Sequence, residues 1–214
     1  MFHSFELEQY LETLVPERNS LMKELEAQAI RETIPVVTPA VGQYLSQLVN
    51  LCGAREILEI GTATGYSTLW LAEGATAHRG RITTIDMNAG RRDEALENFV
   101  RAGQADMIHS LLGDARKILP DLDKAFDFIF IDAAKGEYLE YLELTLPKLK
   151  AGGILAVDNV LFRGWVVPGA VYAPKYDRMV NKLREFLQIL CQNPELKTTV
   201  LPLGDGLAVS QKIM

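Results

Sequence analysis

The stretch EILEIGTATG at residues 56–65 decides the fold class of this chain. Residues 56–60 form a short apolar run, which is typical of a buried strand. Gly61 and Gly65 then predict a tight turn, and the following YSTLWLAEG predicts a helix. A strand, a glycine-rich turn and a helix in this order indicate the first unit of a parallel sheet with crossover helices.

The same alternation continues toward the C-terminus. It predicts helices at 91–103, 138–149 and 177–191, a turn at 151–153, and strands at 81–86, 107–114, 126–132 and 154–159. The tail TTVLPLGDGLAVSQK predicts two more strands, joined by Gly-Asp-Gly as an antiparallel hairpin. We therefore expect a doubly wound, Rossmann-like α/β fold with a mostly parallel seven-stranded sheet and a C-terminal antiparallel hairpin.

Helices are also predicted before the first strand. Apolar residues at three- and four-residue spacing favour helix over 4–31, with a break near Pro16, and a second helix after Pro39 that ends at Gly53. The chain has 214 residues, the size of one large domain. We therefore predict a single domain over 1–214, with the N-terminal helices of 1–53 packed on its core.

Composition narrows the class of protein further. The chain lacks an apolar run long enough to cross a membrane, and its acidic N-terminus does not resemble a signal peptide, so we expect a cytoplasmic protein without a membrane partner. Cys52 and Cys191 are then expected to be free thiols. The net charge of −6 argues against broad, nonspecific binding of nucleic acid, although a local basic patch is compatible with it.

Candidate ligand-binding residues follow the first two strands, because ligands of such sheets bind at the carboxyl ends of the strands. Glu59 precedes the glycine turn, where its carboxylate would repel a pyrophosphate but suits an amine or a sulfonium. Asp86 ends the second strand and could accept hydrogen bonds from ribose hydroxyls of a nicotinamide or an S-adenosylmethionine cofactor. A turn without a ligand, and a solvated turn aspartate, are the alternatives.

Three oxygen-bearing side chains end two later strands. Asp132 follows one strand, and Asp158 and Asn159 close the next. If the strands are neighbours, the oxygens converge at one edge of the sheet, where a hard cation such as Mg²⁺ or Ca²⁺ would neutralise the carboxylates. The alternative is that Asp132 only caps the following helix. Lys135 is either a surface lysine or, beside a cation, an amine of lowered pKa that can act as a base.

With these residues in place, the sequence resembles the cation-dependent O-methyltransferases, the group that contains catechol and caffeoyl-CoA O-methyltransferases. The resemblance spans roughly residues 35–210 and rests on six segments together: EILEIGTATGYST, GRITTID, GDA (113–115), FIFIDAAKGEY, GGILAVDNVLFRG and PLGDGLAVS. It implies an S-adenosylmethionine-dependent O-methyltransferase with a Rossmann-like fold, and a homodimer that could use the N-terminal helices.

The resemblance also implies a role for each site residue. Asp132, Asp158 and Asn159 match the metal ligands for Mg²⁺ or another hard cation such as Ca²⁺ or Mn²⁺, and Lys135 matches the proposed general base. The residues that it implies in cofactor binding are Val37, Glu59, Gly61, Gly65, Ser67, Asp86, Asp114, Ala115 and Asp132.

A narrower resemblance concerns the methyl acceptor. FIDAAKGEY, DNVLFRGWV and PLGDGLAVS are similar to the bacterial members that methylate 5-hydroxyuridine at the tRNA wobble position to 5-methoxyuridine. The plant and catechol enzymes usually carry a different pattern near Ala134, such as an acidic residue. The expected substrate is therefore the tRNA anticodon loop, with a small catechol or other phenolic as the alternative.

One segment bears directly on that choice. Residues 162–186 interleave five basic side chains with the aromatic residues Phe162, Trp165, Tyr172 and Tyr176. Such a segment could bind phosphates and stack an unpaired base, or it could be a basic helix face with loop aromatics in the core or at a dimer contact. Two other functions stay open: a nicotinamide-dependent oxidoreductase, and an RNA-binding module without catalysis.

Overall fold

The computed structural model describes residues 5–213, apart from the side chains of Phe5 and Glu8. Its backbone falls into two compact units, residues 1–115 and 116–214. The prediction of one domain over 1–214 stays a prediction. No helix in residues 5–213 has both the length and the apolar character needed to cross a membrane.

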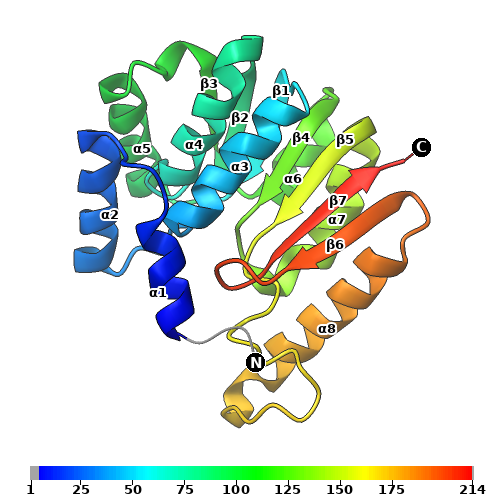
Figure 1. Cartoon of the computed structure of the whole chain (residues 1–214). Helices are drawn as coiled ribbons and strands as arrows, with labels where there is room; N and C mark the ends of the chain where they lie inside the picture. The colour runs from blue at the N-terminus through cyan, green and yellow to red at the C-terminus, as the bar shows by residue number, and fades with distance from the viewer. Residues whose placement is uncertain (1–4, 214) are drawn as a thin grey trace. The chain divides into compact units, whose positions relative to one another are not determined.

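The N-terminal unit (blue to green in Figure 1) contains three parallel strands in the order β3-β2-β1. These are β1 (Glu56–Ile60), β2 (Arg81–Asp86) and β3 (Ile108–Leu112), and they are aligned so that Ile60 pairs with Ile85 and Asp86 with Leu112. Five helices accompany them: α1 (Phe5–Thr13), α2 (Ser20–Glu32), α3 (Pro39–Leu51), α4 (Tyr66–Ala75) and α5 (Ala89–Arg101).

Side-chain caps begin three of these helices, including α5, where the Asn88 side chain accepts a hydrogen bond from the Arg91 backbone N–H. The Asn19 side chain accepts a hydrogen bond from the Met22 backbone N–H at the start of α2, and Thr38 caps α3 at the Val41 N–H, with Pro39 at the first helical position. The predicted break near Pro16 is confirmed, because α1 ends at Thr13 and α2 begins at Ser20. Residue 4, the predicted start of this region, lies outside the described residues.

The core of this unit is built around β1 and α4. Every residue of β1 after Glu56 is buried, and α4 is buried along its length except at Glu73. A helix that is apolar all round has to be covered on more than one side. Helix α3 packs along α4, and α4 in turn packs on β2. The glycine turn between β1 and α4 therefore joins two elements that are each held by their neighbours.

The C-terminal unit (green to red in Figure 1) contains four strands in the order β4-β5-β7-β6. Strands β4 (Phe126–Ile131) and β5 (Leu149–Val157) are parallel, whereas β7 (Leu207–Lys212) runs antiparallel to β5 and to β6 (Leu196–Leu201). Its helices are α7 (Tyr138–Thr145) and α8 (Asp177–Gln192), and the short α6 (Ala115–Ile118) spans the boundary between the units. The doubly wound α/β class, with seven strands in residues 5–213 and a C-terminal antiparallel hairpin, is confirmed.

The prediction was wrong at one connection. The helix expected over 138–149 ends at Thr145, and the expected turn at 151–153 lies inside β5. Pro147 cannot continue a helix, so the chain passes through a 3₁₀ turn at Leu146–Lys148 and enters the strand at once. The extra length is absorbed by a shift of register between Phe126 and Phe128, where Gly152 adopts a φ of 79°.

Candidate active site

The carboxyl ends of β1, β2 and β3 are tied together by backbone hydrogen bonds. The Gly61 N–H donates to the Ile85 carbonyl at 2.9 Å, and the Gly113 N–H donates to the Asp86 carbonyl at 2.8 Å. The turn at Gly61 and the turn that carries Asp114 therefore both lie beside the end of β2. Three segments that are far apart in the sequence are joined at the edge where the cofactor residues were predicted.

Glu59 is fully buried and surrounded by hydroxyl donors. Its carboxylate accepts hydrogen bonds from Ser67 Oγ at 2.6 Å and Thr84 Oγ1 at 2.6 Å, and a further one from Thr68 Oγ1. A buried charge without such partners would be costly. The structure thus brings together two predicted cofactor residues, Glu59 and Ser67, and fixes the rotamer of the carboxylate.

Asp86 holds the glycine turn in place. Its Oδ2 accepts a hydrogen bond from the Ala63 N–H at 2.8 Å, and its Oδ1 accepts one from the Asn88 N–H at 2.8 Å. A carboxylate can accept about four hydrogen bonds, so these two contacts leave capacity for ribose hydroxyls. The side chain is only half-buried, which is compatible with access by a ligand.

Gly65 is required by the geometry at the start of α4. Its φ is 87°, and a Cβ at this position would lie 2.5 Å from Phe99 Cε1 on α5. The missing side chain lets the turn approach α5, and Asn98 of the same helix donates to the Thr64 carbonyl at 3.0 Å. The close contact of turn and helix explains why this glycine ends the GxxxG spacing.

The other predicted cofactor residues are placed less directly. Val37 is buried in the segment between α2 and α3, Ala115 is buried at the start of α6, and Asp114 is half-buried. Val37 is not joined to the Glu59 group by any contact described above. The roles of all three in cofactor binding stay predictions.

The predicted cation ligands meet at the ends of β4 and β5. The two strands are neighbours, Ile131 pairs with Val157, and the Asp158 N–H donates to the Ile131 carbonyl at 3.0 Å. Asp158 is 2% exposed, whereas Asp132 and Asn159 are half-buried. Asn159 leaves the strand with a φ of 55°, a conformation that asparagine tolerates better than most residues.

Burial disfavours the charged form of both carboxyl groups. It raises the pKa of Asp158 to about 8, an effect strengthened by the neighbouring Asp132 carboxylate and opposed by the Asn159 N–H and Lys135. Burial also raises the pKa of Asp132 to about 6, and the Lys135 charge opposes this shift. A bound cation would relieve the repulsion between the buried Asp158 carboxylate and the half-buried Asp132 carboxylate.

Lys135 is not a free surface lysine. It begins a 3₁₀ turn, Lys135–Glu137, and its half-buried Nζ donates to Asn159 Oδ1 at 2.8 Å. The alternative role of Asp132 as a helix cap is not supported, because neither this turn nor α7 begins with a side-chain cap. The structure therefore brings Lys135 into the group formed by the predicted ligands.

The ligand set suits a hard divalent cation. Within residues 5–213, His, Cys, Asp and Glu form no group of three that could hold a metal ion, so a site here needs the Asn159 amide oxygen as well as the two carboxylates. Oxygen ligands are those preferred by Mg²⁺, Ca²⁺ and Mn²⁺. The Lys135 ammonium lies 2.8 Å from the Asn159 amide oxygen, so this oxygen already accepts a positively charged group.

Two supporting residues were missed by the sequence analysis. The buried Tyr138 hydroxyl donates to the Asp158 backbone carbonyl at 2.9 Å. Asp205 accepts a hydrogen bond from the Arg163 N–H, and its charge raises the pKa of Asp158 further. From the sequence alone, Tyr138 is predicted only as a helix residue and Gly-Asp-Gly only as a hairpin turn. The sequence signal that could have pointed to Tyr138 is its position only a few residues after Asp132, at the start of the next helix.

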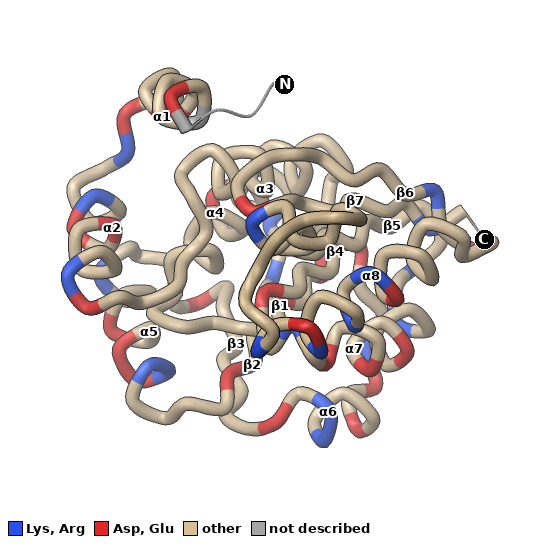
Figure 2. Tube along the Cα trace, turned by 90° about the horizontal axis from the view of Figure 1, so that it is seen from below, with Lys and Arg blue, Asp and Glu red and all other residues tan. Residues whose placement is uncertain are grey.

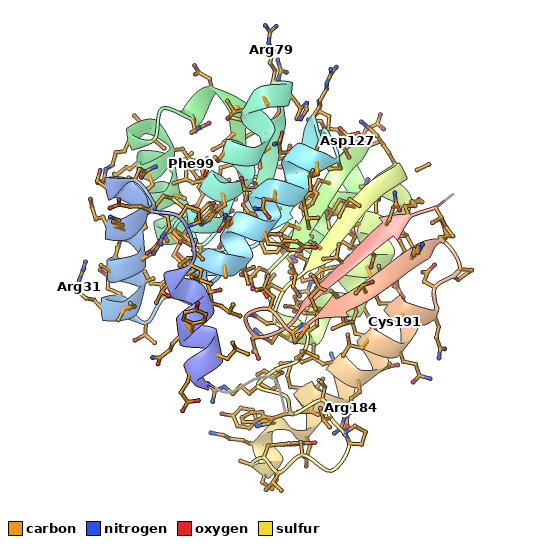
Figure 3. The ribbon with its side chains drawn as sticks, in the orientation of Figure 1. Arg31, Arg79, Phe99, Asp127, Arg184 and Cys191 are labelled. Atoms are coloured by element: carbon orange, nitrogen blue, oxygen red, sulfur yellow. The ribbon has the colours of Figure 1, made fainter. Side chains whose placement is uncertain are left out.

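The aromatic residues after Asn159 pack on one another. Trp165 stacks on Tyr172 with ring centroids 5.7 Å apart, and it lies 4.8 Å from Tyr176 and 5.1 Å from Phe162. Arg184 of α8, labelled in Figure 3, lies beside this loop and donates hydrogen bonds to the carbonyls of Trp165, Val166 and Val167. We call residues 162–176 the aromatic loop.

Only part of the predicted basic segment is free to meet a ligand. Lys182 donates to the Gly136 carbonyl at 2.6 Å and Arg184 is engaged by the aromatic loop. Arg163, Lys175 and Arg178 are exposed. Figure 2 shows acidic and basic residues together on α8, so the segment is not a continuous basic stripe.

Comparisons with known proteins find similar chains among the O-methyltransferases. Residues 12–213 match the family described as O-methyltransferase. The chain is 35% identical to a caffeoyl-CoA O-methyltransferase of Eucalyptus gunnii, over 100% of this chain and 90% of that protein. An O-methyltransferase of Bacillus cereus in complex with SAH superposes with a TM-score of 0.85 at 31% identity, over 97% of each chain. TomG of Streptomyces achromogenes, involved in tomaymycin synthesis and solved with SAM, gives a TM-score of 0.84 at 30% identity, over 98% of this chain and 96% of that one.

Proposed function

Because this chain belongs to the O-methyltransferase family and is an S-adenosylmethionine-dependent O-methyltransferase, we propose that it methylates a hydroxyl group presented by a divalent cation. The observation that carries the proposal is the meeting of Asp132, Asp158 and Asn159 at the ends of β4 and β5. These three side chains would hold the cation. When bound there, a divalent cation supplies the charge that lowers the pKa of an acceptor hydroxyl.

The remaining chemistry belongs to side chains of the enzyme. Glu59, Ser67 and Asp86 would hold the cofactor, which would supply the methyl group when bound, and the acceptor hydroxyl would lose its proton as it takes that group. Positioning of the two reactants accounts for much of the acceleration of such a step. Lys135, in contact with a cation ligand, is placed to take the hydroxyl proton.

The acceptor that the cation site supports best is a ring hydroxyl with a second oxygen on the neighbouring ring atom. Such a pair of oxygens can bind one cation together, and catechols have this arrangement. The curated relative named for caffeoyl-CoA supports a phenolic acceptor of this type. A small phenol with adjacent oxygens is therefore the first candidate substrate.

The second candidate is 5-hydroxyuridine in the anticodon loop of tRNA, where the 5-hydroxyl lies next to a ring carbonyl. The observation that favours it is the aromatic loop with exposed Arg163, Lys175 and Arg178 around it. The Arg163 guanidinium lies 5.4 Å from the Trp165 ring, and the Lys175 ammonium lies 4.9 Å from the Tyr176 ring. Cations held on aromatic faces could bind RNA phosphates near a splayed base.

One experiment tests both candidates. Methyl transfer from labelled S-adenosylmethionine is measured with Mg²⁺ or with a chelator, to tRNA from cells that lack this enzyme and to a simple catechol. Labelling that needs Mg²⁺ supports the cation site, and equal labelling with chelator contradicts it. Labelling of the tRNA at far lower concentration than the catechol selects tRNA, and labelling of the catechol alone selects the phenol.

A matched pair of variants sharpens this choice. Arg163→Gln combined with Lys175→Gln should weaken methylation of tRNA and leave the catechol reaction nearly unchanged, because only the RNA carries phosphates. The control is Lys197→Gln, an exposed lysine on β6, which should affect neither. An equal loss with both acceptors would contradict a role in RNA binding.

The homodimer is a separate proposal. Helix α1 and the residue after it expose three large apolar side chains: Tyr10, Leu11 and Leu14. Exposed apolar groups gathered on one short segment favour burial against a partner. Light scattering on the full chain tests this, and Leu11→Glu combined with Leu14→Glu should then yield monomers. Dimers that persist in this variant would place the interface elsewhere.

A further inference from the structure

Lys135, the proposed base, is also in contact with a proposed cation ligand. Its Nζ lies 2.8 Å from Asn159 Oδ1, the oxygen that completes the proposed cation site. The same ammonium acts electrostatically on Asp132 and on Asp158. One positive side chain thus contacts Asn159 and acts electrostatically on the other two proposed cation ligands.

Three other charged or titratable groups near the ligands, all within residues 5–213, do not supply that positive charge. Asp205 adds negative charge at Asp158, and Tyr138 is a buried neutral phenol whose pKa is raised by burial and by both aspartates. Lys182, the basic residue on the adjacent α8, gives its Nζ to the Gly136 carbonyl. The buried Asp158 and the half-buried Asp132 therefore have Lys135 as their positive partner.

We infer that Lys135 is the counter-ion of the cation-free enzyme, and that an incoming divalent cation must displace its ammonium from Asn159 Oδ1. This inference rests on the proposed cation site. An amide oxygen that bound both groups would hold two positive charges close together, and these repel each other strongly in a half-buried place. Cation binding therefore releases the Lys135 ammonium from Asn159 Oδ1.

If the Lys135 ammonium competes with the cation, one substitution should raise cation affinity where a loss would be usual. Removal of an ordinary supporting residue lowers metal affinity. Lys135→Met removes the competitor and the repulsion, so this variant should bind the cation more tightly than the natural enzyme. Coupling between two such sites typically changes affinity by about 5- to 150-fold, and we expect at least the lower end of this range.

The test uses Mn²⁺ alone as the probe, with the full chain at pH 8 and without cofactor or acceptor. Free Mn²⁺ is counted by electron paramagnetic resonance. Lys135→Met should bind more tightly, whereas Lys135→Arg, which keeps the charge, should stay close to the natural enzyme. The control is Lys150→Met, the same change at an exposed lysine of β5 that pairs with Asp127 at 2.8 Å. It should leave affinity unchanged.

Thermal unfolding provides a second readout. In chelator, Lys135→Met should unfold at a lower temperature than the natural enzyme, and Mn²⁺ should close or reverse this gap. Equal or weaker Mn²⁺ binding by Lys135→Met, with normal binding by the natural enzyme, overturns the inference and leaves the cation site standing. Absence of Mn²⁺ binding in the natural enzyme and in every variant overturns the cation site itself. If Lys135→Met does not fold, Lys135→Gln takes its place.

Discussion

The Tyr138 hydroxyl donates a hydrogen bond to the backbone carbonyl of Asp158 at 2.9 Å. This bond joins the start of α7 to the end of β5, so the Tyr138 side chain fixes the backbone that carries Asp158 and Asn159. The Tyr138 ring is held in turn by Phe186 of α8, with ring centroids 5.4 Å apart. Four predictions follow from this contact and from others in the site.

Tyr138→Phe should weaken cation binding about tenfold, because groups that orient metal ligands have effects of about 10- to 100-fold. It leaves a buried carbonyl without its partner, at a cost of about 1–3 kcal/mol in stability. Affinity for S-adenosylmethionine should stay unchanged. Calorimetry with each ligand measures this, and Tyr141→Phe on the same helix, which loses a bond to Glu137, is the matched control. Equal effects of the two variants would contradict a positioning role for Tyr138.

Glu59→Gln should reduce S-adenosylmethionine affinity at least tenfold. The neutral amide removes the negative charge and replaces one acceptor with a donor that faces hydroxyl groups, at an expected cost of about 1–3 kcal/mol in stability. Calorimetric titration with the cofactor and urea unfolding measure the two effects. Glu73→Gln, the same change at the exposed position of α4, should alter neither. Normal cofactor affinity in Glu59→Gln would assign Glu59 to the fold alone.

Gly65→Ala should destabilise the enzyme by more than the strain of a positive φ. That strain costs about 1–2 kcal/mol for a residue with a Cβ. Gly103 provides the comparison, since its φ is 67° but a Cβ there would meet nothing within 4 Å. The additional loss in Gly65→Ala measures the overlap with Phe99, a residue labelled in Figure 3. If urea unfolding gives the same loss of stability for Gly65→Ala and Gly103→Ala, then α5 moves away from the added Cβ without a cost in free energy.

The stability of the cation-free enzyme should fall as pH rises from about 4 to about 8, in contrast to the usual behaviour of carboxyl groups. The pKa of Asp158 is raised to about 8 in the folded state, above the ordinary 3.8, so the folded protein holds its proton longer than the unfolded chain. The contribution is complete below the unfolded pKa and is lost as pH passes the folded pKa. Each proton involved contributes a slope of at most about 1.4 kcal/mol per pH unit.

Saturating Mg²⁺ should abolish this decline, because the cation binds the ionised form. Urea unfolding between pH 5 and pH 9, in chelator and in Mg²⁺, measures both curves. Asp158→Asn is the control and should flatten the curve in chelator. If the stability of the natural enzyme in chelator changes with pH in the same way as that of Asp158→Asn, the raised pKa of Asp158 is contradicted.

The sequence by itself determined the order and type of nearly all the strands and helices. Apolar runs such as 56–60 and 126–131 are long and regular, and the caps and breaks at Asn19, Thr38 and Pro16 act locally. It also determined which residue types stand at the strand ends, because strand order in the chain places Asp86, Asp132 and Asp158 at carboxyl termini. The start of β5 was not predicted, because residues 151–153 belong to the strand only through the register of its pairing with β4.

Only the tertiary structure decided what those strand ends do together. The contact of Lys135 with Asn159 joins positions 24 residues apart, and the bond from Tyr138 to Asp158 joins positions 20 residues apart. Neither leaves a periodic signal in the chain. The hydroxyl groups around Glu59 come from α4 and β2 in the same way. Removal from water raises the pKa of Asp132 and Asp158 and makes a counter-ion necessary. This burial arises only when the segments pack together, so the sequence alone does not show it.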